Sequence, residues 1–247
     1  MNETISLLKR HRSIRKYKDQ PLSKEMVVQI ISAGQAASSS SNVQAFSVIA
    51  VTDTERKRVL SELAGNQAYI RECPVFLVWC ADLHRLKYTA EKHRPDQQSY
   101  EDVTENFIIA TVDTALAAQN AAVAAESLGL GIVYIGGVRN KIAEVSELLG
   151  LPDLVYPVFG MCLGYPDQEP GLRPRLPVSA VLHWDGYDAE KTAEQVGIYD
   201  ETMIRYLRER TGGQKDTAWS ELMAEKMTQP LRLHMREFLQ KKGFELK

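Results

Sequence analysis

The sequence has few of the residues that build covalent or metal-held frameworks. Only three cysteines occur in 247 residues, Cys73, Cys80 and Cys162, and the five histidines are scattered singly along the chain. An odd number of widely spaced cysteines argues against a disulfide framework and against a paired-cysteine zinc or redox site. We therefore expect no metal site. Cys80 and Cys162 lie inside apolar runs and are expected to be buried, inert thiols.

An excess of one charge sign is also missing. The 30 basic and 32 acidic residues leave a net charge of -2, which gives no support for a nucleic-acid partner. The longest apolar runs are shorter than the ~18 residues that a membrane-spanning helix needs. The N-terminus, MNETISLLKRHRSIRKYK, has no apolar segment ahead of a cleavage site. The expectation is a cytoplasmic protein without a membrane partner.

Motifs of several well-known enzyme classes are absent. The chain has no GxGxxG after a strand, no GxxxxGK(S/T) phosphate loop, no HExxH motif and no GxSxG elbow. These absences give no support to a metalloprotease, a P-loop nucleotidase or a serine hydrolase. We expect no side chain to act as a catalytic nucleophile.

The residues that are present, 44% hydrophobic and 25% charged, have the balance of an ordinary globular protein. Short apolar or β-branched runs predict strands over 45–52, 74–81, 131–135 and 155–165. Amphipathic or alanine-rich patterns predict helices over 3–10, 24–37, 54–64, 102–128, 140–149, 200–211, 218–228 and 230–242. Residues 83–100 are polar and give no clear prediction. This order predicts a layered α/β or α+β domain whose sheet is covered by helices.

The longest helical signal is unusually rich in alanine, with eight alanines within residues 110–128. A helix this long and this apolar is expected to be buried on most sides, in part by a second subunit. The charged, amphipathic helices after residue 200 indicate that the C-terminal part of the chain lies outside the core. We expect a core of residues 1–199 and a C-terminal helical excursion of residues 200–247.

Two clusters of basic residues contain no acid. The first is KRHRSIRKYK at 9–18, and the second is GLRPRLP at 171–177, where prolines flank Arg173 and Arg175. Because proline fixes φ, these two arginines are held on a stiff, extended backbone. One interpretation is a solvated helix end and a basic surface loop. The other is a receptor for a phosphate group, which guanidinium groups bind well.

Two further segments also allow a structural or a ligand-binding interpretation. SSSSN at 38–42 follows a predicted helix and is either a flexible polar loop or a hydroxyl-rich ligand contact. YIGG at 134–137 follows a predicted strand. It is either a simple turn or a place where a flat ligand presses on a glycine backbone.

Six segments occur in an order and at spacings that resemble the nitroreductase family of flavoproteins, in particular its NADPH-dependent flavin reductases and oxygen-insensitive nitroreductases. They are HRSIRKYKDQPLS, SSSSNVQA, GNQAYI, AAESLGLGIVYIGGVRN, FGMCLGYP and RPRLP. The resemblance covers essentially the whole chain. It implies an α+β fold with a mixed central sheet flanked by helices and a C-terminal helical excursion. It also implies an intertwined homodimer.

The resemblance further implies a non-covalent FMN at the dimer interface, in contact with both subunits. The residues that it assigns to FMN are His11, Arg12, Ser13, Arg15, Ser39, Ser40, Gln67, Ile135, Gly136, Gly137, Arg173 and Arg175. The serines and Gln67 would come from the second subunit, and Arg173 and Arg175 would hold the phosphate. Asn42 stands where relatives can carry an aromatic residue, which bears on substrate choice.

The chemistry implied is hydride transfer from NADPH through FMN to a flat, electron-poor acceptor in a ping-pong cycle. Free flavins, nitroaromatics and quinones are such acceptors. The 2′-phosphate of NADPH would be bound by Arg208, Arg210 and Lys215 in a loop over 208–215. Without the resemblance, that segment is a frayed helix end capped by glycine. A non-catalytic phosphate-ligand binding protein and a flavin carrier without turnover stay open as alternatives.

Overall fold

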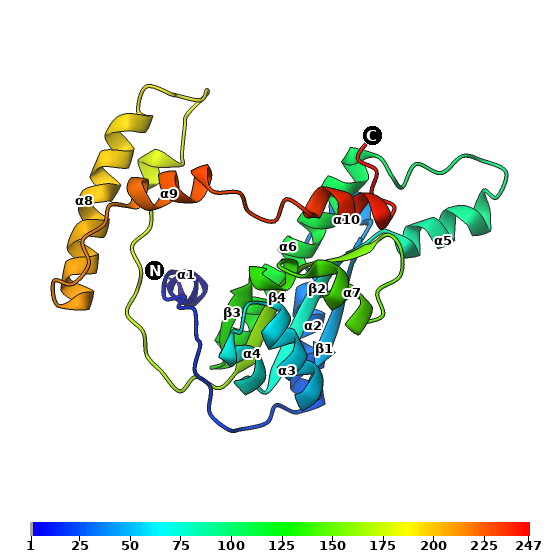
Figure 1. The fold of residues 1–247 in the computed structure, drawn as a ribbon, viewed down its shortest axis with the longest axis horizontal. Coiled ribbons are helices and arrows are strands. Elements are labelled where there is room, and N and C mark those ends of the chain that lie inside the picture. The colour runs from blue at the N-terminus through cyan, green and yellow to red at the C-terminus, as the bar shows by residue number, and fades with distance from the viewer. Residues whose placement is uncertain (1) are drawn as a thin grey trace. The chain divides into compact units, whose positions relative to one another are not determined.

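The computed structural model describes residues 2–247 and divides them into two compact units (Figure 1). The second unit is Gly171–Leu231, and the first comprises the residues up to Pro170 together with Arg232–Lys247. The first unit contains α1 (Glu3–Lys9), α2 (Lys24–Gln35), η1 (Ser40–Asn42), β1 (Phe46–Val51), α3 (Thr54–Leu63), α4 (Ala68–Glu72), β2 (Val75–Asp82), α5 (His84–His93), α6 (Thr104–Ser127), β3 (Gly131–Ile135), η2 (Gly136–Arg139), α7 (Ile142–Leu148), β4 (Val155–Gly164) and α10 (Met235–Lys241). The second contains η3 (Val178–Ala180), α8 (Thr192–Thr211) and α9 (Trp219–Thr228).

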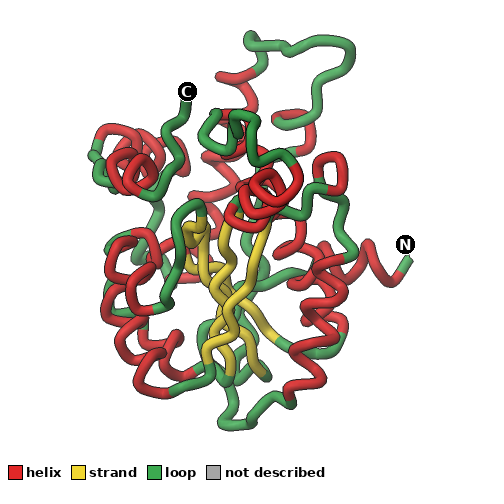
Figure 2. The backbone as a smooth tube through the Cα atoms, turned by 90° about the vertical axis from the view of Figure 1, so that its right-hand side faces the viewer, coloured by secondary structure: helices red, strands yellow, loops and turns green. Residues whose placement is uncertain are grey.

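The first unit is built on one four-stranded sheet in the order β1-β2-β4-β3, with helices on both of its faces (Figure 2). Strand β2 is buried along its whole length, as its two apolar faces predict. Phe76, Val78 and Cys80 pack against α3, α4 and α7. The alternate residues Leu77 and Trp79 pack against α2 and α6. This α+β layering confirms the predicted fold class.

The sheet differs from the expected mixed sheet. All of the pairings between its four strands are antiparallel. The parallel pairing in the described part of the chain is limited to one bridge, between Ser13 and Ile132. Because the N-terminal segment meets β3 at a single residue, it adds a bridge to the sheet rather than a fifth strand.

Three of the predicted helix boundaries are confirmed by the residues that flank them. Ser23 Oγ accepts a hydrogen bond from Met26 N at 3.1 Å, which begins α2. Asp53 Oδ1 accepts one from Arg56 N at 2.8 Å, which begins α3. Gly129 follows α6 with a φ of 79°, the left-handed conformation that glycine adopts without strain.

Two helical predictions are wrong in their extent, and two helices were not predicted. α8 begins at Thr192, so the predicted boundary at residue 200 lies inside a continuous helix. Gly197 lies within this helix, where a glycine costs about 1 kcal/mol relative to alanine. α10 begins at Met235 rather than at residue 230, because Arg232 has a φ of 54° and so cannot belong to a right-handed helix. α4 and α5 were not predicted, since both are short and polar.

Helix α6 passes a length and composition test for a membrane-spanning helix. The sequence predicted no membrane-spanning segment because none of its uninterrupted apolar runs is long enough. In the structure one face of α6 is buried through alanines and through Asp113 and Thr114. The helix packs on α2 and on the strands of the sheet, which are the contacts of a core helix.

All three cysteines are free and buried. Burial raises the pKa of the Cys80 thiol to about 12 and also raises that of Cys162. Thiolate is the reactive form of cysteine, so these two residues are inert near neutral pH. The interpretation of Cys80 and Cys162 as buried thiols is confirmed.

Candidate functional site

The first basic cluster lies along the start of β3. Ser13 forms the parallel bridge with Ile132, and Ile14 N donates a hydrogen bond to Ile132 O at 2.8 Å. A Cβ atom on Gly131 would lie 2.5 Å from Ile14 Cγ1. Only glycine therefore permits the N-terminal segment to approach the strand this closely, and the segment holds His11 and Arg12 at the edge of the sheet.

Two side chains of this basic cluster pair with acids from distant parts of the sequence. His11 Nδ1 lies 2.5 Å from Glu126 Oε1, near the end of α6, and Arg12 Nη1 lies 3.0 Å from Glu169 Oε1. Neither acid was among the predicted site residues. Glu126 could have been noticed as the one acid that closes the alanine-rich helix. Arg15 is exposed and forms no ion pair with the residues that the structure describes.

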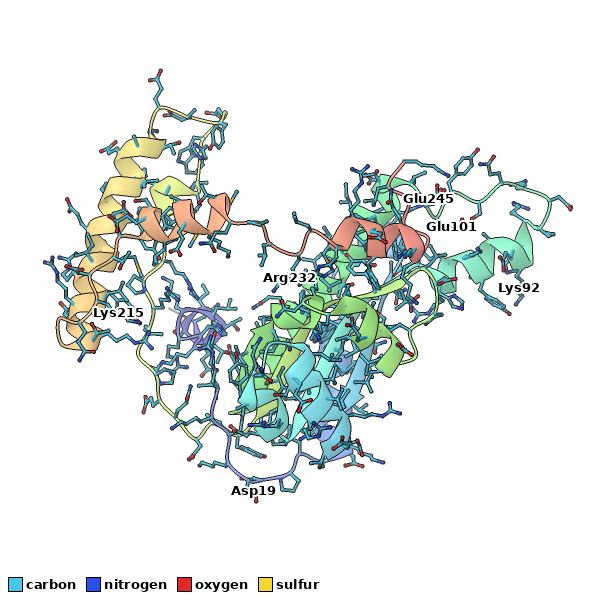
Figure 3. All side chains as sticks on the ribbon, viewed as in Figure 1. Asp19, Lys92, Glu101, Lys215, Arg232 and Glu245 are labelled. Carbon is cyan, nitrogen blue, oxygen red and sulfur yellow. The ribbon has the colours of Figure 1, made fainter. Side chains whose placement is uncertain are left out.

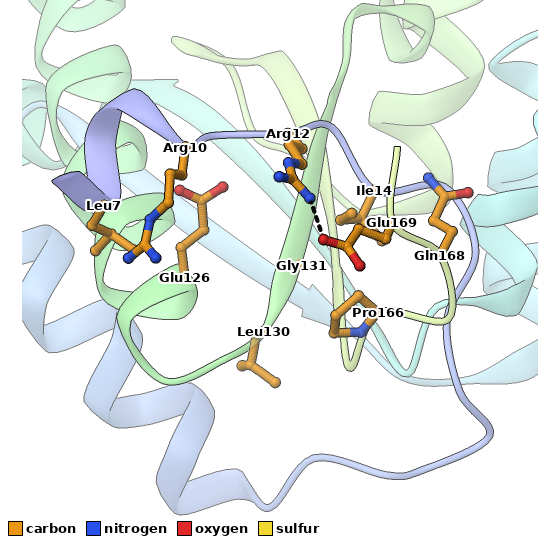
Figure 4. Close-up of a pocket in the computed structure, with 10 residues that line it drawn as sticks. All are labelled: Leu7, Arg10, Arg12, Ile14, Glu126, Leu130, Gly131, Pro166, Gln168 and Glu169. Atoms are coloured by element: carbon orange, nitrogen blue, oxygen red, sulfur yellow. Dashed lines mark hydrogen bonds and ion pairs between the residues drawn. The ribbon is translucent and has the colours of Figure 1, made fainter. Parts of the chain in front are cut away.

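A pocket of about 460 Å³ opens beside this cluster (Figure 4). Its lining includes Arg10, Arg12, Glu126, Gly131 and Glu169. Among the predicted flavin residues only Arg12 lines it. Arg12 Nε is buried and has no hydrogen-bond partner in the described residues. A buried donor normally has an acceptor, so this atom suits an oxygen of a bound ligand such as FMN.

The predicted residues Gln67 and Gly137 are in contact within one chain. A Cβ atom on Gly137 would lie 2.3 Å from Gln67 Nε2 and 2.4 Å from Ala64 O. Gln67 Nε2 donates to Ala64 O at 2.7 Å, and its Oε1 accepts from the Tyr69 hydroxyl. Close packing therefore requires a glycine at this position, which lies in η2 just after Ile135 ends β3.

The serine loop, Ser38–Ala45, links α2 to β1 in a defined hydrogen-bonded conformation. Three of its residues, Ser41, Asn42 and Gln44, have positive φ angles of 46°, 60° and 52°. The buried carboxylate of Asp113 accepts from Ser40 N at 3.0 Å and from Ala45 N at 3.2 Å. Asp113 was not among the predicted site residues, although it is the only charged residue between Phe107 and Ala125.

Within one chain, the candidate flavin residues of the first unit form separate groups. His11 contacts Glu126, and Ser40 contacts Asp113, and both of these acids are on α6. The acids are thirteen residues apart. At about 1.5 Å per residue they are separated by ~20 Å along the helix axis. The structure therefore does not bring His11 and Ser40 together in a single copy.

The remaining candidates belong to the second unit. Arg173 and Arg175 are exposed on either side of Pro174, whose carbonyl oxygen accepts from the buried Tyr199 hydroxyl at 2.9 Å. This hydrogen bond fixes the backbone between the two arginines. It agrees with the stiff, extended segment that the prolines predict.

The predicted basic loop over 208–215 is in part helical. α8 continues to Thr211 and ends at Gly212, which has a φ of 60°, so Arg208 and Arg210 lie in its last turn. Arg208 Nη2 lies 3.2 Å from Asp216 Oδ2, and Arg210 Nη1 donates to the Tyr206 hydroxyl at 2.9 Å. Lys215, labelled in Figure 3, follows the helix and forms no ion pair with described residues.

Nearly the whole chain matches known protein families. Residues 8–68 and 59–165 match the Nitroreductase family, and residues 173–247 match the Nitroreductase family, C-terminal domain. The chain is 44% identical to the FMN reductase (NADPH) of Bacillus subtilis (strain 168) over 246 residues, which cover 99% of both chains. It is 42% identical to the Cr(VI) reductase of Pseudomonas sp. (strain G-1), covering 98% of both chains.

Solved structures agree with these sequence matches. The NADPH:FMN oxidoreductase from Vibrio harveyi complexed with NAD+ has a TM-score of 0.87 at 43% identity. The comparison covers 98% of both chains. Because the family matches cover nearly the whole chain and these relatives are 42% and 44% identical over nearly their full length, the chain belongs to the nitroreductase family.

Proposed function

We propose that this protein is an FMN-dependent oxidoreductase that uses NADPH to reduce flavins, nitroaromatics or quinones. The observation that carries the proposal is the buried Arg12 Nε, a donor without an acceptor in the described residues. It occurs in a chain whose full length is similar to an FMN reductase (NADPH) and to a Cr(VI) reductase. When bound, FMN would supply the hydride chemistry, accepting from NADPH and passing electrons to the acceptor.

The roles of the chain's own residues follow from their chemistry. Arg12 and Arg15 are cations that would oppose negative charge developing on the ring. Gly136 and Gly137 allow a flat ring to approach the backbone behind Ile135. Arg173 and Arg175 are suited to the phosphate, because guanidinium groups form paired, charge-assisted hydrogen bonds with it. His11, Ser13, Ser39, Ser40 and Gln67 complete the proposed FMN set.

A homodimer would complete this site. His11 and Ser40 contact acids that are ~20 Å apart along α6. One flavin can therefore meet both groups most simply if they come from different copies. Ile108, Val112 and Leu116 recur at four-residue spacing on α6 and are 47%, 48% and 44% exposed. An apolar helical stripe of this kind is typical of a surface that another chain covers. The proposal therefore makes the homodimer the active form.

The dimer prediction can be tested by sedimentation. The FMN-loaded protein is expected to sediment as a dimer at low micromolar concentration. Its flavin is expected to dissociate when dilution separates the subunits, because each site draws on both chains. A stable monomer that retains FMN at the same concentration would contradict the shared site.

The enzymatic prediction can be tested by colour. The purified protein should be yellow, and its flavin absorbance should bleach when NADPH is added without oxygen and return when a quinone is added. A yellow protein that NADPH does not bleach would instead be a flavin carrier. A colourless protein that does not take up FMN would be a binding module for another phosphate ligand.

The proposal also places the enzyme in the cytoplasm. All three cysteines are free, and free thiols persist in a reducing compartment. The proposed partners are small, flat electron acceptors and a second copy of the chain, with no nucleic acid and no membrane among them.

A further inference from the structure

The serine loop has a backbone that its residues would not adopt alone. Ser41, Asn42 and Gln44 all lie in the left-handed region, and no residue of Ser38–Ala45 is glycine. Each such residue costs free energy relative to the ordinary helical or extended regions. A strained conformation of this kind persists only where the surrounding structure holds it.

Asp113 supplies much of that support. Its two carboxylate oxygens accept from Ser40 N and Ala45 N, so one side chain joins two points five residues apart in the loop. The residue is only 2% exposed and forms no ion pair with the described residues. Burying a carboxylate is unfavourable unless hydrogen bonds compensate. The two loop amides provide that compensation, which ties the loop conformation to the Asp113 side chain.

Arg85 supports the far end of the same loop. Its Nη1 donates to Gln44 O at 3.3 Å and its Nη2 to Ser47 Oγ at 3.1 Å. Within the loop, Ser39 Oγ accepts from Gln44 N at 3.3 Å. A hydroxyl group that accepts in this way still has its own hydrogen to donate. The Ser39 hydroxyl can therefore donate this hydrogen to a ligand while it accepts from Gln44 N.

We propose that Asp113 is a positioning residue for the flavin, because it fixes the serine loop in the conformation that presents Ser39 and Ser40. This inference rests on the proposed FMN function. Asp113 does not itself contact the flavin in this proposal. Its effect should reach the ribityl chain and the ring edge and should not depend on the phosphate.

The test uses the apoprotein prepared from the full-length chain and titrated with FMN and with riboflavin. Asp113→Asn places an amide donor against one of the two loop amides, so we expect both ligands to bind about tenfold more weakly, equivalent to 1.4 kcal/mol. The factor should be the same for FMN and riboflavin. The matched control is Thr114→Val, a neighbouring buried residue that bonds to Ala110 O and Cys80 O and not to the loop. This control should bind both flavins like the unmodified chain.

A double-mutant cycle separates positioning from general stability. Ser39→Ala should weaken flavin binding in the unmodified chain and cause little further loss in Asp113→Asn, since the loop is already displaced there. Additive losses, or an Asp113→Asn variant that binds both flavins normally, would overturn the proposed role of Asp113. Neither result would affect the proposed FMN function. An unmodified apoprotein that takes up no flavin would overturn the proposed function.

Hydrogen exchange gives a readout that needs no variant. Ser40 N donates to Asp113 Oδ1 at 3.0 Å, so this bond should protect the Ser40 amide from exchange. In the unmodified apoprotein we expect it to exchange far more slowly than an unstructured peptide amide. Exchange at the unstructured rate would show that the carboxylate does not hold the loop and would overturn the proposal.

Discussion

Replacing Arg175 by alanine is expected to weaken FMN binding about ten- to a hundredfold. A charge-assisted hydrogen bond contributes roughly 1.5–3 kcal/mol, and each 1.4 kcal/mol corresponds to a factor of ten in affinity. Arg175 is suited to such a bond because its backbone is already fixed by Pro174 and by the Tyr199 hydroxyl. A group held in place before binding loses less entropy when the ligand arrives. Titration of the apoprotein with FMN measures the loss.

Riboflavin, which lacks the phosphate, separates this effect from damage to the ring site. The Arg175→Ala variant should bind riboflavin as the unmodified chain does, whereas Asp113→Asn should weaken both ligands equally. Arg236→Ala is the matched control, since Arg236 is exposed and forms no ion pair with described residues. If the unmodified protein binds riboflavin as tightly as FMN, the phosphate contact does not exist.

The strands could be predicted from sequence because their signal is local. The run GIVYI predicted β3 at its observed bounds, and AFSVIAVT predicted β1 to within one residue at each end. Both runs are rich in β-branched residues, which pack well on a pleated surface. The all-antiparallel pairing could not be read in this way, because pairing joins residues that are far apart in sequence.

The acids that pair with the candidate site residues could not be predicted from the sequence for the same reason. The cluster at 9–18 contains no acid, yet His11 meets Glu126, which lies 115 positions away. Asp113 meets Ser40 across 73 positions. Neither pairing follows from the periodicity of a single segment. The resemblance identified the loops that carry the candidate residues, whereas the acids that hold two of them in place became visible only in the structure.

The preference for NADPH over NADH is expected to depend on the end of α8. The cofactors differ by the 2′-phosphate, which adds a dianion that the cations Arg208, Arg210 and Lys215 can bind. These cations differ in whether an acid already pairs with them in the structure. Arg208 pairs with Asp216, whereas Arg210 donates to the neutral Tyr206 hydroxyl and lies over its ring, with Cζ 5.8 Å from the centroid. Arg210 therefore keeps its full charge available to a phosphate while its side chain is already oriented.

Arg210→Ala is expected to raise the Michaelis constant for NADPH by about tenfold, which corresponds to 1.4 kcal/mol. This is less than a buried contact would give, because exposed charges are screened by water and salt. Steady-state kinetics with both cofactors should show little change for NADH and no loss of bound FMN. Arg205→Ala, an exposed arginine on the same helix, is the matched control and should leave both constants unchanged. Equal losses with NADPH and NADH in Arg210→Ala would mean that this helix end does not bind the 2′-phosphate.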